Sequence, residues 1–513
     1  MQDTAITRDQ KKTLWFVITA SSVGTLIEWY DFYIFGSLAT ILSEQFFPHT
    51  NPTAAFLSTL GTFAAGFIVR PFGAIVFGRL GDLVGRKYTF LVTLILMGGS
   101  TFAIGLVPGY ETIGMLAPII VLVLRLLQGL ALGGEYGGAA TYVAEHAPAA
   151  KRGFYTSFIQ TTATLGLFVS IGVILAVRHY VGIEEFNEWG WRIPFLLSSI
   201  LVGVSIFIRL RMDESPLFAK IKKEGKISKN PIKESFGNKE NLTLVLIALF
   251  GATAGQGVVW YTGQFYAMTF IEKTCGVEFV QTRNIIAIAL LIGTPLFIYF
   301  GWWSDKIGRK MIMMVGLLLA VFLYRPIYQK MYSMTDVSLK TEVVEKKSIV
   351  SVVKFTDEGD SIATHKMIRA YTDGSILQET TTERSHKNTA EKTVEKKKEL
   401  TLDGIIYYSM IGLVLIQVVL VTMVYGPIAA FLVELFPTRI RYTSMSLPYH
   451  IGNGIFGGLT PLVATSLFVM SKTSENPSGD PLAGLWYPIV VAALTFIIGM
   501  IFLSNKKKGE VME

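Results

Sequence analysis

The sequence predicts an all-α membrane protein with twelve transmembrane helices in two pseudo-symmetric six-helix bundles. Half of its 513 residues are hydrophobic and only 16% are charged. A charged loop sequence occurs twice, each time between two long apolar runs. Lys and Arg also gather in alternate short loops. Because lipid offers the backbone no hydrogen-bond partners, apolar runs of this length cross it as helices.

Apolar runs near the roughly 20 residues that a helix needs to cross a bilayer define the spans. In order they occupy residues 14–42, 53–78, 88–107, 115–145, 153–178, 191–210, 241–271, 284–303, 311–328, 404–436, 441–470 and 483–504. The first run is too long for a signal peptide, carries Glu28 and Asp31, and lacks a small-residue cleavage site. We therefore interpret it as a span.

The charges predict how these spans are oriented. Basic residues occupy alternate loops: Arg79, Arg86 and Lys87, then Lys151 and Arg152, the connector 209–240, then Lys306, Arg309 and Lys310, Arg439 and Arg441, and the tail Lys506 to Lys508. The intervening loops carry Glu44, Glu111, Glu184, Glu185 and Glu188. The positive-inside rule places the basic loops and both termini in the cytoplasm, in the cytoplasmic membrane of a bacterium. The formal charge of +8 then needs no nucleic-acid partner.

The duplicated loop shows that the two halves are related. Five residues, Gly78, Asp82, Gly85, Arg86 and Lys87, recur 223 positions later as Gly301, Asp305, Gly308, Arg309 and Lys310. A second pattern, Glu145, Pro148 and Arg152, recurs 289 positions later as Glu434, Pro437 and Arg441. The two offsets differ by about 66 residues, so the second half contains an insertion between its two motifs. Such internal repeats are typical of secondary transporters.

The insertion falls at about 329–400, where apolar runs stop and charges of both signs become dense. Counting spans places it outside the cell. Alternating residues around Val352 and Met367, with the turn pair Asp373-Gly374, predict short β-hairpins. We expect a solvated helix or linker at 391–398. The insertion is either a tolerated surface segment or a part that captures substrate or binds a partner, and we favour the first.

These boundaries give the domain organisation. Residues 1–210 form an N-terminal six-helix bundle, residues 211–240 a basic cytoplasmic linker, and residues 241–513 a C-terminal bundle that the 329–400 insertion interrupts. The linker's Lys and Arg residues fit a membrane surface and set topology.

The two loops, the paired Glu-x-x-Pro segments and the span count resemble the major facilitator superfamily. Three further segments, Leu26 to Tyr33, Arg70 to Gly73, and Arg125 to Gly138, resemble its metabolite:proton symporter family. The resemblance covers the chain except 329–400. It implies proton-coupled transport of compounds such as proline, betaine, shikimate, 2-oxoglutarate or citrate.

Ionisable groups inside spans are functional candidates, because burying a charge at mid-membrane costs about 2.5 kcal/mol or more. The chain concentrates them in its first half, as Glu28, Asp31, Arg70, Arg125 and Glu135. Aligning the repeats places neutral residues opposite them: Val414 matches Arg125, and Thr262 matches Asp31. We therefore expect proton chemistry in the first half.

Three carboxylates against two guanidinium groups leave one surplus negative charge, which a proton would neutralise. We expect Asp31 to carry that proton, with Arg125 as its switching partner, as the resemblance also implies. The alternative is a static ion pair between two helices. For Glu28 and Glu135 we expect a part in proton coupling, although Glu135 lies among four glycines and a structural role for it is equally consistent.

Substrate contacts are expected from Arg70 and from residues on spans 1, 4 and 7: Trp29, Tyr33, Gln128, Trp260, Tyr261 and Gln264. Arg70 has the geometry to bind a carboxylate, but we favour its pairing with Glu28 or Glu135. Aromatic rings attract quaternary ammonium groups, yet in spans they more often pack or anchor. His450 in span 11 titrates near neutral pH when unperturbed; we favour a packing role.

The loop motifs are expected to form gates at the cytoplasmic face, as the resemblance implies. Asp82, Arg86 and their copies Asp305 and Arg309 are placed to cap neighbouring helices and to bridge to Glu145 or Glu434. Arg152 and Arg441 belong to the same network. The alternative is that Arg86 and Lys87 only set topology.

The sequence therefore predicts a proton-coupled symporter that imports a small organic acid or zwitterion by alternating access. A proton-driven exporter and a uniporter of the same fold remain alternatives, and so does a membrane sensor that uses residues 329–400 as its input. An enzyme is not expected, because no phosphate-binding glycine loop and no nucleophile with a base is recognisable. A single cysteine, Cys275, and unclustered histidines give no metal site. The proton gradient takes the place of a cofactor, and the lipid bilayer, substrate and proton are the expected partners.

Overall fold

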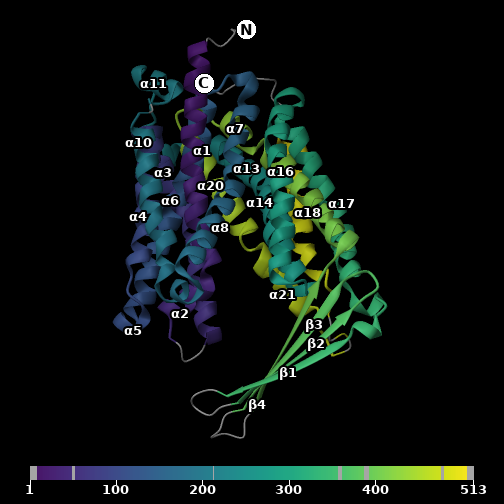
Figure 1. Cartoon of the computed structure of the whole chain (residues 1–513). Helices are drawn as coiled ribbons and strands as arrows, with labels where there is room; N and C mark the ends of the chain where they lie inside the picture. Colours follow the sequence, from purple (N-terminus) through teal and green to yellow (C-terminus); the bar gives the residue numbers. More distant parts are fainter. Residues whose placement is uncertain are drawn as a thin grey trace.

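A computed structural model describes residues 8–48, 52–211, 213–355, 361–385, 392–474, 476 and 479–504. It shows two helical halves side by side and a β-sheet that projects from one end (Figure 1). The tail Lys506 to Lys508, which the charge pattern places in the cytoplasm, lies outside the described residues.

The N-terminal half consists of six long helical segments. They are α1 (Arg8–Ser37), α3 (Pro52–Leu83), α4 (Arg86–Leu106), α6 (Leu116–His146), the pair α7 (Arg152–Gln160) and α8 (Thr162–Val181), and α10 (Arg192–Leu210). Three short helices, α2 (Ala39–Phe46), α5 (Tyr110–Ile113) and α9 (Ile183–Glu185), join them. The 211–240 linker forms α11 (Pro216–Lys223) and α12 (Pro231–Gly237).

The C-terminal half repeats this plan with more interruptions. Its segments are α13 (Lys239–Ala248) with α14 (Ala254–Tyr261) and α15 (Ala267–Thr269), then α16 (Phe279–Ile307), α17 (Arg309–Thr335), α18 (Gly404–Tyr425) with α19 (Ile428–Leu435), α20 (Arg441–His450) with α21 (Thr460–Met470), and α22 (Trp486–Phe502). Wider π-helical turns at Thr262–Tyr266 and Ile451–Gly457 interrupt two of them. Such turns often mark functional sites.

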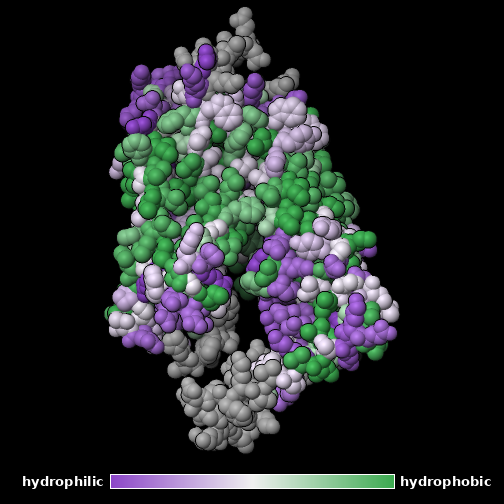
Figure 2. Space-filling view, viewed as in Figure 1, coloured by the Kyte–Doolittle hydropathy of each residue, from purple (hydrophilic) through white to green (hydrophobic). Residues whose placement is uncertain are grey.

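Eleven of the described helical segments are long and apolar enough to cross a membrane. The twelfth segment, α1, is 30 residues long and carries Glu28 and Asp31 on buried positions. Figure 2 shows a hydrophobic belt around the middle of the molecule and hydrophilic residues at both ends. The protein is therefore an integral membrane protein of the predicted all-helical class.

The two ends of the molecule carry different loops. At one end lie α11 and the start of α1, at the other lie α2, α5 and the sheet (Figure 1). Lys310 Nζ donates to the carbonyls of Met500 and Leu503 at 2.9 and 2.6 Å, which brings the end of α22 to the α16–α17 turn. We call the end with these basic turns the basic end and the other the sheet end.

The insertion folds as a four-stranded antiparallel meander in the order β1-β2-β3-β4. Its strands are β1 (Ser348–Phe355), β2 (Ser361–Ala370), β3 (Ile376–Ser385) and β4 (Lys392–Thr401). The β2–β3 turn contains the predicted Asp373-Gly374 pair, with Gly374 at φ +83°. The insertion begins later than predicted, because α17 continues to Thr335 and is buried as far as that residue.

The prediction of a helix or linker at 391–398 was wrong, because residues 392–401 form β4 and Glu391 lies outside the described residues. This charge-dense segment joins the sheet through a continuous backbone pairing with β3, and one ion pair accompanies it. Glu379 on β3 pairs with Arg369 and with Lys398, the latter at 2.7 Å. The Lys398 hydrogen bond, with Arg369 nearby, lowers the pKa of Glu379.

The sheet is fixed to the C-terminal half at its base. Leu400 pairs with Val277 as a parallel bridge, its amide donates to Gly276, and its carbonyl accepts from Glu278. The Gln281 amide makes two hydrogen bonds of 2.7 Å to the backbone of Leu402. The sheet therefore moves with this half.

Replacing Gly374 with valine is expected to loosen the β2–β3 turn. A left-handed conformation costs an ordinary residue about 1–2 kcal/mol, and a Cβ here would lie 2.9 Å from Asp403 Oδ2. Hydrogen exchange of β2 and β3 should rise in Gly374→Val and rise less in Gly374→Asn, because Asn tolerates this conformation. Equal exchange in the wild type and Gly374→Val would contradict this view of the turn.

Candidate functional site

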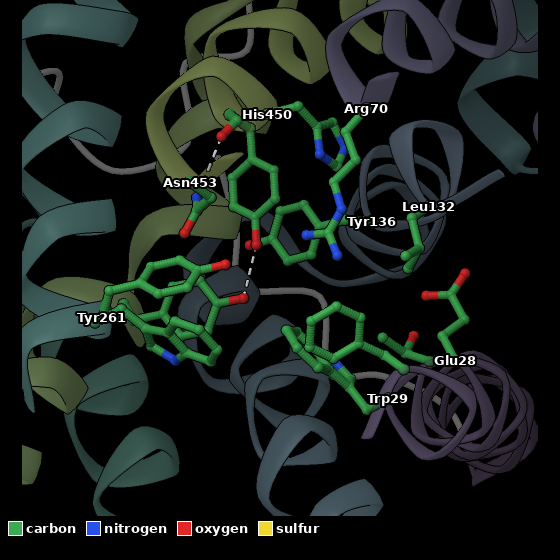
Figure 3. A pocket seen from close by; sticks show the side chains of 13 residues that line it. Glu28, Trp29, Arg70, Leu132, Tyr136, Tyr261, His450 and Asn453 are labelled. Atoms are coloured by element: carbon green, nitrogen blue, oxygen red, sulfur yellow. Dashed lines mark hydrogen bonds between the residues drawn. The ribbon is translucent and has the colours of Figure 1, made fainter. Parts of the chain in front are cut away.

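A cavity lies between the two halves, near the middle of the spans (Figure 3). The N-terminal half contributes residues of α1, α3 and α6, and the C-terminal half contributes α14, α18, α20 and the turn after α20. The lining residues are Thr25, Glu28, Trp29, Phe32, Arg70, Leu132, Tyr136, Trp260, Tyr261, Tyr425, Tyr449, His450 and Asn453. Both halves thus share the site, as alternating access requires.

Aromatic rings form most of its walls. Tyr136 of the first half stacks on Tyr449 of the second, with ring centroids 3.7 Å apart and planes at 4°. The hydroxyls of Tyr449 and Tyr425 are 2.7 Å apart. Trp29 meets Trp260 across the halves at 5.6 Å. These contacts give the cavity flat aromatic surfaces from both halves.

Arg70 brings a positive charge to the cavity. Its guanidinium carbon lies 4.3 Å from the centre of the Phe67 ring and 5.3 Å from that of Phe32. Among the described residues it forms no ion pair, and its Nε has no hydrogen-bond partner. The favoured pairing of Arg70 with Glu28 or Glu135 is therefore wrong for this conformation, because another arginine occupies that place.

Two further polar groups line the wall from the second half. Asn453 exchanges two hydrogen bonds with Gln256, at 3.1 and 2.8 Å. His450 Nε2 is buried and has no partner within the described part of the chain. Figure 3 shows His450 and Arg70 on the same side of the cavity. His450 therefore lines the cavity as well as packing within the second half.

Several expected contacts do not reach the cavity. Tyr33 is buried beside Trp29, with ring centroids 5.7 Å apart. Gln264 and Gln128 are also buried and do not line it. The sequence reasoning missed Tyr136, Tyr425, Tyr449 and Asn453 as lining residues. The four-residue spacing of Tyr449 and Asn453 on one helix face is the signal that was available.

Asp31 and Arg125 lie near each other but do not form an ion pair. Thr101 and Arg125 are the polar side chains that act on the Asp31 carboxylate, and among the described residues neither lies within hydrogen-bond geometry of its two oxygens. Arg125 Nη1 donates to Gln128 Oε1 at 2.8 Å, and Gln128 Nε2 donates to Thr101 at 2.6 Å. The static ion pair is therefore absent from this conformation.

Glu135 does form a buried ion pair, with Arg209 of α10. Both side chains are at most 1% exposed, and Thr93 also donates to Glu135 at 2.8 Å. Glu28 lies against Glu135. The sequence reasoning counted Arg209 among the cytoplasmic connector residues, and that assignment was wrong. With Arg209, three carboxylates face three guanidinium groups, so the surplus negative charge disappears.

The first loop motif joins the two halves at the basic end. Asp82, at the end of α3, accepts hydrogen bonds from the amides of Tyr442 and Thr443 in the first turn of α20, at 3.3 and 2.8 Å. Arg86 lies 3.2 Å from Asp82 and donates to the Thr438 carbonyl at 2.7 Å. A carboxylate at a helix N-terminus satisfies free amides and complements the helix dipole.

The second loop motif makes the same contact in reverse. Asp305 accepts from the amides of Gly153 and Phe154 in the first turn of α7, at 2.9 and 2.8 Å. Arg309 pairs with Asp305 at 2.6 Å and with Glu434 at 3.1 Å. Across the interface, Glu145 pairs with Arg441 at 2.9 Å.

The other motif residues support these contacts. Arg152 Nε donates to the Ala144 carbonyl at 3.0 Å, and Lys87 Nζ donates to the Leu210 carbonyl at 3.2 Å. The close-approach glycines, Gly78 and Gly301, leave no room for a Cβ, which would lie 2.9 Å from Thr443 and 2.5 Å from Ser157. Gly85 and Gly308 have φ values of 140° and 100°.

The linker adds contacts that the sequence did not reveal. Glu214 accepts from the amides of Arg86 and Lys87 at the start of α4. Ser215 donates to Glu145. Phe218 lies under the Arg86 guanidinium at 4.3 Å. The contact between the halves at the basic end therefore has three parts: the two loop motifs and the linker.

Together these observations describe a cavity that is closed at the basic end. Figure 2 shows the surface hollowed between the halves at the sheet end. No cluster of His, Cys, Asp and Glu among the described residues suits a metal ion.

The chain is similar to proteins of known class. The family described as "Sugar (and other) transporter" matches residues 16–243. The chain is 32% identical over 490 residues to the inner membrane metabolite transport protein YhjE of Escherichia coli (strain K12), covering 94% of this chain and 92% of that protein. It is 30% identical over 519 residues to the alpha-ketoglutarate permease of the same organism, covering 99% of both.

Two further similarities have lower identity. A proline/betaine transporter of Salmonella typhimurium is 29% identical over 496 residues, covering 94% of this chain and 82% of that protein. The solved structure of the proton:xylose symporter XylE with bound 6-bromo-6-deoxy-D-glucose matches with a TM-score of 0.70 at 16% identity, covering 98% of both chains. The resemblance read from the two loop motifs is confirmed: the chain belongs to the major facilitator superfamily, among its metabolite transporters, and is not an enzyme.

Proposed function

We propose that the protein is a proton-coupled symporter that imports a small organic acid or zwitterion. The observation that supports this most is the Arg70 guanidinium in a cavity between the halves, which forms no ion pair among the described residues, with two buried carboxyl groups on α1 that form none there either. The alpha-ketoglutarate permease and the proline/betaine transporter, by their names, handle solutes with carboxylate groups.

The unpaired charges suggest how proton and substrate are coupled. In a buried site, Arg70 and Arg125 need negative partners, and neither has one among the described carboxylates. If Asp31 holds a proton, the site carries a net positive charge and attracts an anion. A substrate carboxylate on Arg70 then satisfies that charge. The proton on Asp31 therefore prepares the site for its substrate.

The aromatic walls extend the substrate class to zwitterions. Trp29, Trp260 and Tyr261 present ring faces within the same cavity as Arg70. A ring face attracts an ammonium group, and the more so where water is excluded. An amino acid or betaine therefore finds a cationic partner and an aromatic partner in one cavity.

We assign the basic end to the cytoplasm, following the positive-inside rule. The structure is then in a conformation closed to the cytoplasm, and the loop motifs act as its gate. Opening this gate requires Asp82 and Asp305 to release the helix starts that they cap. These caps and ion pairs stabilise the closed conformation, because each buried charge there has its partner in place.

An uptake experiment tests the proposed function. Purified protein in proteoliposomes should accumulate at least one member of a panel of carboxylates, amino acids and betaines when an inward proton gradient is imposed. Substrate uptake at the same rate with and without the proton gradient would indicate a uniporter. Loss of substrate from preloaded vesicles, driven by the opposite gradient, would indicate an exporter. Binding without flux would indicate a sensor.

Replacing Asp31 with asparagine is expected to separate exchange from accumulation. Asn keeps the shape but cannot release a proton, so the carrier stays in its proton-loaded form. Asp31→Asn should exchange internal for external substrate at a rate near that of the wild type. It should not accumulate substrate on a pH gradient. Undiminished gradient-driven accumulation would contradict the role of Asp31.

Replacing Arg70 with glutamine is expected to raise the KM for a carboxylate substrate about 10- to 100-fold, because a hydrogen bond to a charged group contributes about 1.5–3 kcal/mol. Arg79→Gln is the matched control, since Arg79 is exposed on the same helix. Initial uptake rates at varied substrate concentration measure this effect. An unchanged KM in Arg70→Gln would exclude Arg70 as a substrate contact.

Replacing Gly81 with alanine is expected to open the cytoplasmic gate. A Cβ on Gly81 would lie 2.0 Å from the Tyr442 ring, across the interface between the halves. Gly99→Ala is the control, because a Cβ there meets nothing within 4 Å. Spin labels at Arg79→Cys and Lys306→Cys, in a Cys275→Ser background, should move apart only in Gly81→Ala. Identical distance distributions would contradict the gate.

A further inference from the structure

The contacts around Glu28 are unusual for a buried acid. Its carboxyl group lines the cavity on α1, is 3% exposed, and has one oxygen without a hydrogen-bond partner among the described groups. The charged or titratable groups that act on it come from four other helices: Arg70 of α3, Glu135 of α6, Arg209 of α10 and Tyr442 of α20. Of these, Glu135 is placed beside α1 through Arg209: the guanidinium nitrogen that pairs with Glu135 also lies against Gly24, one helical turn before Glu28.

Glu135 is held as the ionised member of this pair. Arg209 donates one terminal nitrogen to Glu135 and the other to the Phe90 carbonyl at 2.7 Å, so its guanidinium is fixed. Thr93 donates to the second oxygen of Glu135. A carboxyl group that accepts from an arginine and from a hydroxyl has donors on both oxygens, which stabilises its ionised form.

The path of Arg209 to Glu135 depends on a glycine. Arg209 passes α1 at Gly24, where a Cβ would lie 1.9 Å from Nη2. A residue larger than glycine at this position would displace the guanidinium from the glutamate. Helix α1 therefore carries both Glu28 and Gly24, and the space beside Gly24 lets Arg209 reach Glu135.

We propose that Glu28 and Glu135 form a second proton site, in which Glu28 carries the proton and Arg209 is the positioning residue that keeps Glu135 ionised. Two neighbouring carboxyl groups that are both excluded from water repel each other when both are ionised, so one of them takes up a proton. Arg209 neutralises one negative charge and not two. The proton therefore resides on the member that lacks the arginine.

This site is coupled to substrate through Arg70. Arg70 acts electrostatically on Glu28 and lines the same cavity. When an anion binds Arg70, it screens that positive charge and favours the protonated form of Glu28. By linkage, the proton on Glu28 favours anion binding to the same extent. This inference deepens the proposed proton coupling, and its test needs no substrate.

Infrared spectroscopy of the purified full-length protein tests the site, because the C=O stretch of a protonated carboxyl group is resolved from that of a carboxylate. The background is Asp31→Asn, so that Asp31 contributes nothing. At neutral pH we expect one buried protonated-carboxyl band. Glu28→Gln should abolish it. Glu135→Gln should abolish it too, because Arg209 then faces Glu28 and ionises it.

Arg209→Gln should have the opposite effect and roughly double the band, because Glu135 then also takes up a proton. Arg192→Gln is the matched control on the same helix, since Arg192 donates only to the carbonyls of Gly105 and Val107. It should leave the band unchanged. A band that persists in Glu28→Gln or in Glu135→Gln would overturn the shared site, whether or not Arg209→Gln folds. A band that Arg209→Gln leaves unchanged would overturn the role of Arg209.

These outcomes are independent of the uptake experiment. Transport without proton coupling would remove the proposed function but leave the band and its response to the three variants in place. Proton-coupled transport with no such band would instead leave Asp31 as the carrier and remove the second site.

Discussion

Two buried aspartates hold the halves together at the basic end, and the shape of the cavity depends on them. Asp82 caps the first turn of α20, and Asp305 caps the first turn of α7. The acceptor pairs are equivalent: Gly153 and Phe154 are the repeat partners of Tyr442 and Thr443, 289 residues apart. Because each cap crosses from one half to the other, neither half can tilt while both caps are intact. The contact between the halves is therefore symmetrical.

The same constraint explains the chemistry of the surrounding residues. A carboxylate excluded from water needs donors on every side, and each aspartate receives backbone amides and an arginine. Glycines at Gly78, Gly81 and Gly301 allow the backbones to approach closely enough for these bonds. The linker supplies Glu214 to the amides that begin α4, so the peptide between the halves also stabilises the closed gate. The repeated motif, the close packing at the glycines and the pairing of the buried charges thus all stabilise the same contact between the halves.

Much of the fold follows from the sequence because its signals are local. Apolar length gives the spans, the charged turns give the loops, and the difference between the two repeat offsets locates the insertion. The partners of buried charges do not follow, because they are contacts between helices far apart in the chain. Arg209 stands at the end of a span, so the sequence predicts that it lies at the surface. In the structure it is buried, because it donates to Glu135, which lies 74 residues earlier in the chain. Likewise, the charge-dense β4 forms a strand through its pairing with β3, a contact that the local sequence does not reveal.

The repeat also shows why one half holds the ionisable groups. Thr262 aligns with Asp31, and Gln417 aligns with Gln128 at the 289-residue offset. The two are buried, and Thr262 Oγ1 and Gln417 Oε1 have no hydrogen-bond partners among the described residues. The second half therefore has polar but uncharged side chains at these two repeat positions. Thr262 and Gln417 carry no ionisable group, so the proton binding that we propose involves the first half. The second half then responds through the shared cavity wall and the two caps, which connect it to α1, α3 and α6.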